Sequence, residues 1–506
     1  MSNTTNSLAQ VKLRDYQDAS IEAVRAEIRK GRKRVLLCVP TGGGKTLTSA
    51  SILASAVAKS SRVGFIAHRL ELIDQTVRTF ARLGVDQIGV IRGQDPRRNL
   101  KAPIQVASIQ TLSRRPGIMG DVQVIVVDEC HRSYANTYRK HIFEAYPNAV
   151  ILGLTATPCR TDGKPLGELF EALVIGARYS ELIAEGHILA PIVYGTPISP
   201  DLTRVRTTAG DYNLEDLEEA VNRSAIIGNI VAEWKRHSAG RRTVVFAVSV
   251  AHSHALRDAF IEAGARAGHV DGTTPEDERR ATLARLDAGE LDIVCNVGVL
   301  CEGWDMPSCK CLVLARPTKS LALYMQMAGR ILRPWGDSLP LILDHGGNVD
   351  RHGMPHQDRD WSLESRVAKS AGVAPCKACP ACFCYVAAGS KVCPLCGHKF
   401  VMIAGVDFPE PEVLPVDLAL RTLDGPDAQL SFFRALVKTA SERGWKLGAI
   451  WHKYRERWGE DPPNGWMPAA RKGHKLDAEW QAKIATREQS SPQTFTSATD
   501  AIARNE

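Results

Sequence analysis

The sequence predicts an α/β protein with two parallel-sheet domains in tandem, followed by a small cysteine-rich module and a helical C-terminal unit. Three observations predict this: two successive series of short β-rich apolar runs, a dense cluster of cysteines after them, and a tryptophan-rich basic segment near the C-terminus. At 506 residues the chain is too long for one core of ordinary size, so two to four folded units are expected.

Two series of apolar runs alternate with longer amphipathic stretches, which is the pattern of buried parallel strands connected by helices. The strands predicted for the first domain are Val35–Val39, Val63–Ala67, Ile104–Ala107, Val122–Val127 and Ala149–Leu154. Those predicted for the second domain are Thr243–Ala247, Arg266–Val270, Asp292–Val297, Cys311–Ala315 and Leu339–Leu343. The join is expected near Ala190–Pro200, where proline and glycine interrupt any regular element.

These boundaries divide the chain into five predicted parts. They are residues 1–190, residues 191–365, the cysteine-rich module 374–402, the helical unit 417–486 and a disordered tail 487–506. A proline-punctuated linker at Asp407–Pro415 separates the module from the helical unit, and the tail is rich in Ser, Thr, Gln and Ala.

The composition favours a soluble cytoplasmic protein. Hydrophobic residues make up 44% and charged residues 24%, near the averages for globular proteins. The sequence contains neither an uncharged apolar stretch of about 18 residues nor the pattern of a signal peptide. The net charge of +8, from 64 basic and 56 acidic residues, suits a polyanionic partner without requiring one.

A glycine-rich segment, Pro40–Thr46, lies between an apolar strand and a helical run that begins near Lys45. Small residues let backbone N–H groups converge on phosphate oxygens, and the helix N-terminus adds partial positive charge. The predicted nucleotide-binding residues are Thr41, Gly42, Gly43, Gly44, Lys45 and Thr46. Lys45 would reach the β- and γ-phosphates of ATP, and the Thr46 hydroxyl would ligate Mg²⁺. The strict pattern has glycine where this chain has Val39, and a simple glycine-rich turn is the alternative.

Asp128 and Glu129 directly follow the four-residue run Val124–Val127. A parallel strand that ends in paired carboxylates places them at the sheet edge where α/β proteins bind ligands. Asp128 can hold Mg²⁺, and Glu129 can orient and deprotonate the attacking water. A surface pair that caps a helix is the alternative interpretation.

Six of the thirteen cysteines lie within 21 positions, which indicates metal binding rather than disulfides. Two Cys-Pro-x-Cys knuckles, ten residues apart, contain Cys379, Cys382, Cys393 and Cys396. Four thiolates satisfy tetrahedral Zn²⁺, so a zinc ribbon with a structural or binding role is expected. Cys376, Cys384 and His398 leave the choice of ligands partly open.

Taken together, these segments resemble the superfamily 2 helicases of the DEAD/DEAH class, with Asp-Glu-Cys-His as the second motif. The resemblance covers about residues 11–347 and implies two RecA-like domains. It matches Gln17 to the glutamine that contacts adenine, Ala67–Arg69 to the first nucleic-acid motif and Thr155–Pro158 to the third motif. It matches Asn296–Asp305 to the fifth motif, which puts Asp305 at the nucleotide, and Gln326–Arg333 to the sixth.

The same resemblance assigns the arginines of the sixth motif to the γ-phosphate across the interdomain cleft. Gln326, Arg330 and Arg333 are therefore expected to be catalytic, together with Lys45, Asp128 and Glu129 from the first domain. Guanidinium groups there stabilise charge that develops on the transferred phosphoryl group. Domain closure around ATP would then become a step along a strand.

With the downstream cysteine ribbon included, the chain looks like the bacterial and prophage RadD-type helicases, which are implicated in DNA repair. This implies DNA, single-stranded or forked, as the partner. An RNA helicase, the motor subunit of a restriction-type complex and an ATP-switched scaffold remain alternatives. Arg69, Thr111, Arg114 and Thr273 are candidate phosphate contacts, although ordinary loop polarity explains each of them equally well.

The C-terminal segment offers two interpretations. Between Ser431 and Trp480 there are ten basic and six acidic residues, with five of the nine tryptophans, which would suit stacking on single strands. However, Trp451, Tyr454 and Trp458 share one helical face, which favours the core of a small helical domain.

Overall fold

The computed structural model describes residues 12–68, 70–85, 87–130, 136–159, 166–238, 240–301, 303–364 and 375–400, with Phe433, Leu436, residues 447–458 and Pro462 beyond them. The chain divides into two compact units, residues 1–406 and 407–506. None of the helices in the described part is both long and apolar enough to cross a membrane.

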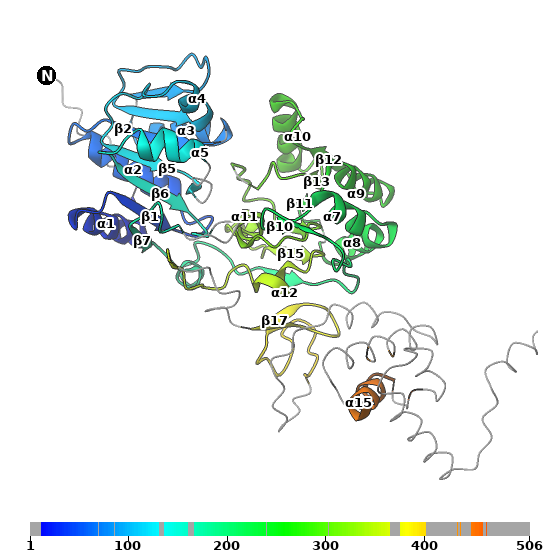
Figure 1. Cartoon of the computed structure of the whole chain (residues 1–506). Coiled ribbons are helices and arrows are strands. Elements are labelled where there is room, and N and C mark those ends of the chain that lie inside the picture. The colour runs from blue at the N-terminus through cyan, green and yellow to red at the C-terminus, as the bar shows by residue number, and fades with distance from the viewer. Residues whose placement is uncertain are drawn as a thin grey trace, which may run out of the picture. The chain divides into compact units, whose positions relative to one another are not determined.

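The first sheet is parallel throughout and has seven strands in the order β3-β4-β2-β5-β6-β1-β7 (Figure 1). The strands are β1 (Arg34–Cys38), β2 (Val63–Ala67), β3 (Ile88–Ile91), β4 (Ile104–Ser108), β5 (Val124–Val127), β6 (Val150–Thr155) and β7 (Ala172–Ile175). This part of the chain, residues 12–175, is called the first lobe below. All five strands that the apolar runs predict are present, whereas β3 and β7 were not predicted.

Helices cover both faces of this sheet because successive strand residues point to opposite sides. Val35 and Leu37 pack with one group of helices, and Leu36 packs with the other. The first group is α1 (Asp15–Arg29), α2 (Lys45–Val57) and α3 (Leu70–Arg82). The second group is α4 (Ile109–Arg114), α5 (Asn136–Tyr138) and the π-helical segment η3 (Arg139–Glu144).

The second sheet is also parallel throughout, with six strands in the order β12-β13-β11-β14-β15-β8. The strands are β8 (Ile192–Tyr194), β11 (Thr243–Phe246), β12 (Ala267–Val270), β13 (Ile293–Asn296), β14 (Cys311–Leu314) and β15 (Leu341–Asp344). Residues 192–352 are called the second lobe below. The five predicted strands correspond to β11–β15, and β8 adds an edge strand that was not predicted.

Helices again cover both faces of the second sheet. The helices of this lobe are α7 (Leu214–Val221), α8 (Ser224–His237), α9 (Val250–Glu262), α10 (Glu276–Ala288), α11 (Leu321–Ala328) with the 3₁₀ turn η4 (Gly329–Ile331), and α12 (Asn348–His352). A small hairpin, β9 (Thr207–Thr208) and β10 (Asp211–Tyr212), precedes α7. Two three-layer α/β lobes in tandem confirm the predicted fold class.

The cysteine module docks on the free edge of the second sheet. Its strands β16 (Cys376–Ala378) and β17 (Tyr385–Ala387) are antiparallel. The backbone N–H of Gly195 donates to the carbonyl of Phe383 at 2.8 Å, and Tyr194 forms a bridge with Cys384. The Tyr385 hydroxyl donates to Asp350 of α12 at 2.7 Å. The module is therefore joined to the second lobe by backbone and side-chain hydrogen bonds.

Two further segments connect the two lobes. Helix α6 (Tyr179–Ala184) follows β7, and its buried residues Tyr179 and Leu182 pack in the core of the second lobe. After α12, residues 354–363 run back to the first lobe, where the carbonyl of Leu363 accepts a hydrogen bond from Gly167 N at 3.0 Å. Residues 354–363 are called the return segment below.

Residues 407–506 form the second compact unit, of which α15 (Leu447–Trp458) is described. Trp451 is 4% exposed and Tyr454 is fully buried, with the Tyr454 ring edge-on to Phe433 at 5.9 Å. Burial of these two rings supports the prediction of a helical core. The side chain of Trp458, the rest of the predicted helical unit and the predicted tail lie outside the described residues.

Candidate nucleotide and metal sites

The glycine-rich segment forms a tight loop between β1 and α2. Gly42 and Gly44 have φ of +91° and +76°, a conformation that favours glycine, and Gly44 is the residue that precedes α2. The Lys45 ammonium donates to the carbonyl of Val39 at 3.2 Å across the loop. The loop thus places Lys45 and the N-terminus of a 13-residue helix together, as a phosphate site requires.

Asp128 and Glu129 lie at the carboxyl end of β5, where they are 6% and 8% exposed. The backbone N–H of Glu129 donates to Asp128 Oδ1 at 3.0 Å, and Glu129 has φ of +47°, which is unusual for a residue with a side chain. This turn ends the strand abruptly and keeps both carboxylates at the sheet edge. Asp128 and Thr46 offer the oxygen ligands that Mg²⁺ prefers.

Cys130, the third residue of the Asp-Glu-Cys-His box, packs in the core and is fully buried. Burial raises the pKa of its thiol well above the usual value, and the neighbouring carboxylates of Glu129 and Asp128 act in the same direction. A neutral buried thiol fills space and takes no part in chemistry. His131 lies outside the described residues.

The third motif is tied to the phosphate loop. The Thr155 hydroxyl donates to the carbonyl of Thr157 at 2.9 Å and accepts from its backbone N–H at 3.0 Å, which closes a small turn after β6. The Val39 N–H, directly before the loop, donates to the Thr155 carbonyl at 3.0 Å. A movement of this turn would therefore displace the residue that precedes the phosphate loop.

The side chain of Gln17 lies against the phosphate loop and is 2% exposed. Its Oε1 accepts from Arg14 N at 3.0 Å, and a β-carbon built on Gly44 would lie 2.4 Å from its Nε2. The adjacent Tyr16 hydroxyl donates to the carbonyl of Gly43 at 2.9 Å. Tyr16 is a contact that the sequence reasoning missed, although its position beside Gln17 was a signal.

The sixth motif of the second lobe packs directly on the phosphate loop of the first. A β-carbon built on Gly329 would lie 2.6 Å from Cβ of Thr41, and one built on Gly42 would lie 3.5 Å from Cγ of Arg333. Arg333 forms an ion pair with Asp305, and Arg330 Nη1 donates to the carbonyl of Trp304 at 2.7 Å. The structure thus brings Arg333 to the loop that carries Lys45, from more than 280 residues away in the sequence.

Gln326 lies one turn earlier on α11 and is 3% exposed. The fifth motif is tied to the sixth, because the Trp304 carbonyl accepts from Arg330 and Asp305 pairs with Arg333. Two motifs of the second lobe therefore form one cluster beside the phosphate loop.

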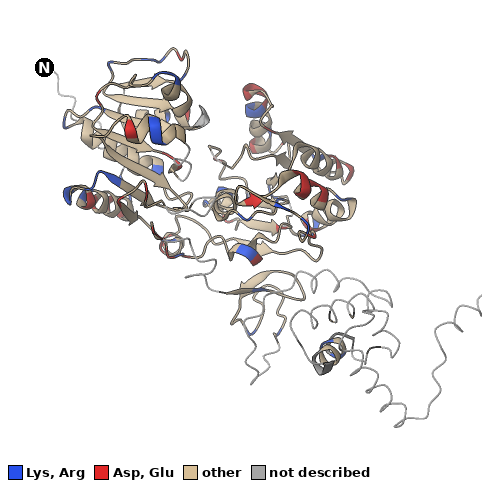
Figure 2. Cartoon of the chain, in the orientation of Figure 1, with Lys and Arg blue, Asp and Glu red and all other residues tan. Residues whose placement is uncertain are grey.

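Four cysteine sulfurs form a compact cluster in the docked module. The sulfurs of Cys379, Cys382, Cys393 and Cys396 lie within 4.8 Å of one another. This spacing and the all-thiol donor set fit one tetrahedral Zn²⁺. Cys384 is directed elsewhere, since its thiol donates to the carbonyl of Tyr385, and His398 packs its ring against Phe400. The module contains three lysines and no acidic residue, and Figure 2 accordingly shows no red on it.

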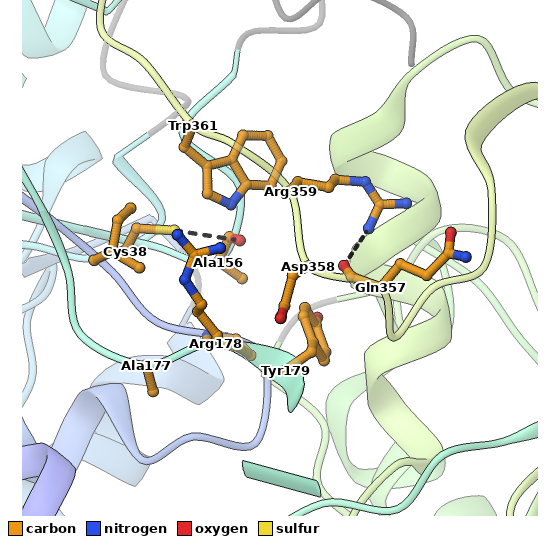
Figure 3. A pocket seen from close by; sticks show the side chains of 11 residues that line it. Cys38, Ala156, Ala177, Arg178, Tyr179, Gln357, Asp358, Arg359 and Trp361 are labelled. Atoms are coloured by element: carbon orange, nitrogen blue, oxygen red, sulfur yellow. Dashed lines mark hydrogen bonds between the residues drawn. The ribbon is translucent and has the colours of Figure 1, made fainter. Parts of the chain in front are cut away.

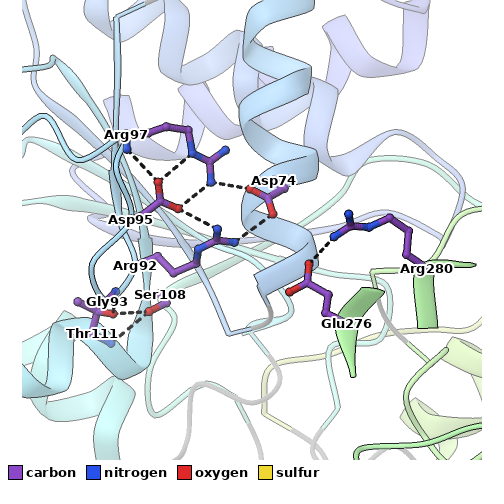
Figure 4. A network of polar contacts seen from close by, with 9 residues as sticks. All are labelled: Asp74, Arg92, Gly93, Asp95, Arg97, Ser108, Thr111, Glu276 and Arg280. Atoms are coloured by element: carbon purple, nitrogen blue, oxygen red, sulfur yellow. Dashed lines mark hydrogen bonds and ion pairs between the residues drawn. The ribbon is translucent and has the colours of Figure 1, made fainter. Parts of the chain in front are cut away.

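The candidate phosphate contacts fall into different environments. Thr111 is 9% exposed, and its hydroxyl accepts from Gly93 N at 3.0 Å and from the Ser108 hydroxyl at 2.8 Å, so it orders a loop (Figure 4). Thr273 is exposed and donates to Asp271 at 2.8 Å. Arg114 is exposed, and Arg69 lies outside the described residues.

An ion-pair network fixes the loop after β3, which is near Thr111 in Figure 4. Arg92 and Arg97 both pair with Asp95 at 2.8 Å and also with Asp74 of α3. These contacts hold the pKa of Asp95 at about 2, chiefly through the hydrogen bond from Arg97. The network therefore stiffens this edge of the sheet.

Comparison with known proteins identifies the family. Residues 10–160 match the model "Type III restriction enzyme, res subunit", and residues 222–334 match the model "Helicase conserved C-terminal domain". The chain is 32% identical over 365 residues to the 51.5 kDa protein of a Lactococcus phage, covering 71% of this chain and 77% of the phage protein. The chain therefore belongs to the superfamily 2 helicases, whose members hydrolyse ATP and act on nucleic acid.

Two other matches agree with this family. A Saccharomyces cerevisiae protein named as the ATP-dependent helicase IRC3 is 31% identical over 339 residues, which cover 63% of this chain and 49% of the yeast protein. The fold is similar to a fragment assigned to the HsdR subunit of a type I restriction enzyme from Vibrio vulnificus, with a TM-score of 0.54, 21% identity, 70% of this chain and 69% of that chain. The chain spans about half the length of the yeast relative. The similarity to the Vibrio fragment identifies the two parallel-sheet domains as RecA-like folds.

Proposed function

We propose that the chain couples ATP hydrolysis to movement on DNA or to its unwinding. The observation that carries this proposal is the packing of Gly329 and Arg333 of the second lobe against Thr41 and Gly42 of the phosphate loop. A triphosphate bound on Lys45 would lie between the lobes, so binding and release of ATP would close and open them.

The side chains have separate roles in this proposal. Lys45 and the amides of the phosphate loop bind the β- and γ-phosphates, while Thr46 and Asp128 hold Mg²⁺, which neutralises phosphate charge. Glu129 orients and deprotonates the attacking water. Arg333 and Arg330 stabilise charge on the γ-phosphoryl group, which requires Arg333 to exchange Asp305 for phosphate.

Gln326 would contact the same phosphoryl group. Gln17 would contact the adenine ring, and Asp305 would contact the bound nucleotide. Four thiolates, from Cys379, Cys382, Cys393 and Cys396, would hold a zinc ion that stabilises the docked ribbon. The proposed parts of the chain keep the predicted bounds: 1–190, 191–365, 374–402, 417–486 and 487–506.

DNA is the proposed partner for two reasons. The first family model and the Vibrio fragment both carry the description of restriction enzymes, which act on DNA. The resemblance to RadD-type helicases points the same way and suggests a role in DNA repair or phage DNA metabolism. The restriction-type relatives also favour a second candidate, the motor subunit of a larger restriction complex.

The decisive experiment is ATPase activity titrated with single-stranded DNA, duplex DNA, forked DNA and RNA. The rate of ATP turnover should rise with single-stranded or forked DNA. It should be lost in Lys45→Ala at every DNA concentration. Equal stimulation by RNA would favour an RNA helicase, and background turnover with every nucleic acid would favour an ATP-switched scaffold. Stimulation only after addition of a nuclease partner would favour the restriction complex.

A further inference from the structure

The phosphate loop is supported from behind by α6. The side chain of Leu182 lies 3.4 Å from a β-carbon built on Gly43, and Ile188 lies 3.4 Å from one built on Gly42. Tyr179 is 5% exposed and lines one pocket together with Pro40, at the start of the loop. Leu182 of α6 and Ile188 of the turn after it therefore contact two consecutive positions of the loop.

The return segment in turn holds the start of α6. Asp358 Oδ1 accepts from the backbone N–H of Ser180 at 3.2 Å, and Asp358 Oδ2 accepts from the Ser180 hydroxyl at 2.5 Å. A carboxylate at a helix N-terminus satisfies an otherwise unpaired N–H and complements the helix dipole. Asp360 adds only a long, exposed ion pair to Arg178 at 3.8 Å.

A buried guanidinium gives the return segment its shape. Arg359 is 6% exposed and donates to the carbonyls of His352 at 2.8 Å, Met354 at 3.2 Å and Gln357 at 3.0 Å. These hydrogen bonds fold the chain after α12 into a compact turn that presents Asp358 to α6. Figure 3 shows Asp358, Arg359 and Trp361 around a pocket. Its other walls include Cys38, which is next to the phosphate loop in the sequence, and Ala156, which belongs to the third motif.

We infer that Asp358 is a positioning residue for ATP. By capping α6, it holds Leu182 and Ile188 against the phosphate loop and so keeps the loop in the shape that accepts the triphosphate. Asp358 touches neither ATP nor the reacting atoms, and its effect falls on nucleotide binding rather than on the chemical step. The inference rests on the proposed nucleotide site at Lys45.

The test compares Asp358→Ala with Asp358→Asn, using the full-length protein and saturating single-stranded DNA. Asp358→Ala should raise KM for ATP by about three- to tenfold, as expected for the loss of a hydrogen-bonded cap, with kcat within about twofold. Asp358→Asn keeps the size and the Oδ1 acceptor, so it should restore KM to near the wild-type value. Asp360→Ala is the matched control and should leave KM unchanged.

A double-mutant cycle separates this role from general loss of stability. Ser180→Ala removes the hydroxyl contact from the other side, so its effect on KM should not add to that of Asp358→Ala. A wild-type KM in Asp358→Ala, or additive effects in the cycle, would overturn the inference. Failure of the proposed site itself has a different signature, namely ATP turnover that persists in Lys45→Ala.

Discussion

Gly329→Ala tests whether the two lobes meet as the structure shows. Gly329 has helical backbone angles, φ −63° and ψ −14°, so alanine is acceptable to the backbone. Its new methyl group would lie 2.6 Å from Cβ and 2.9 Å from Cγ2 of Thr41, about 1 Å closer than carbon atoms normally approach. The lobes could then close only by displacing the phosphate loop or the sixth motif.

Overpacking of this kind costs about 1–3 kcal/mol, which corresponds to about a five- to 150-fold loss. Because the clash arises only when the lobes meet, the loss should appear in kcat for ATP hydrolysis. The affinity of the first lobe for a fluorescent ATP analogue should change little. Steady-state ATPase assays and equilibrium nucleotide titration measure the two quantities separately.

Gly228→Ala is the control, since a β-carbon on this residue of α8 would meet nothing within 4 Å. It should leave kcat unchanged and hold or slightly raise the melting temperature, because alanine favours a helix more than glycine does. A kcat for Gly329→Ala within twofold of wild type would mean that the lobes do not approach in this way during turnover.

Three further outcomes are expected. Arg333→Ala should lower kcat on the order of a thousandfold while DNA binding persists. Asp305→Asn should have a smaller effect, because it removes the ion-pair partner of Arg333 and the expected nucleotide contact of Asp305 but leaves the Arg333 guanidinium in place; a DNA-binding titration beside the ATPase assay would expose a folding defect. Metal analysis of the purified protein should give one zinc per chain, lost in Cys393→Ser and kept in Cys384→Ser; equal zinc in both variants would contradict the four-thiol assignment. Burial raises the pKa of Asp344 from 3.8 to about 6, so the folded state holds this proton where the unfolded state releases it. The contribution of Asp344 to the free energy of unfolding should therefore fall as pH rises from about 4 to about 6. Asp344→Asn removes this contribution and should change the pH dependence in denaturant titrations; an identical pH dependence in the variant would refute the assignment.

The sequence was most informative where structure is local. Each strand predicted from an apolar run is present, because a run buried on both faces has few alternatives in water. The strands that were not predicted lie at sheet edges, where the signal is weak: β3 contains Gly89, β7 has an exposed Ile175, and β8 has only three residues. The phosphate loop and the paired carboxylates also depend on neighbouring residues and were correctly placed in their local elements.

Contacts between distant segments could not be derived in this way. Nothing in the sequence around Asp358 indicates that it caps a helix 178 positions earlier, because a single aspartate in a loop carries no pattern. The orientation of Arg333 towards Gly42 was expected only through the resemblance to helicases. The cysteines illustrate this difference within one module. Their sequence spacing identified the metal cluster, but only the structure shows that the thiol of Cys384 donates to the carbonyl of Tyr385 and does not join the cluster.

The docked cysteine module, called the ribbon here, also keeps the edge of the second sheet from pairing with other copies of the chain. Strand β8 ends the second sheet, and without the ribbon its outer N–H and C=O groups would be open to strands from other chains. Metal depletion would unfold the ribbon and uncover this border. We therefore expect chelator-treated protein to sediment as oligomers at high concentration, even though each motor core remains folded.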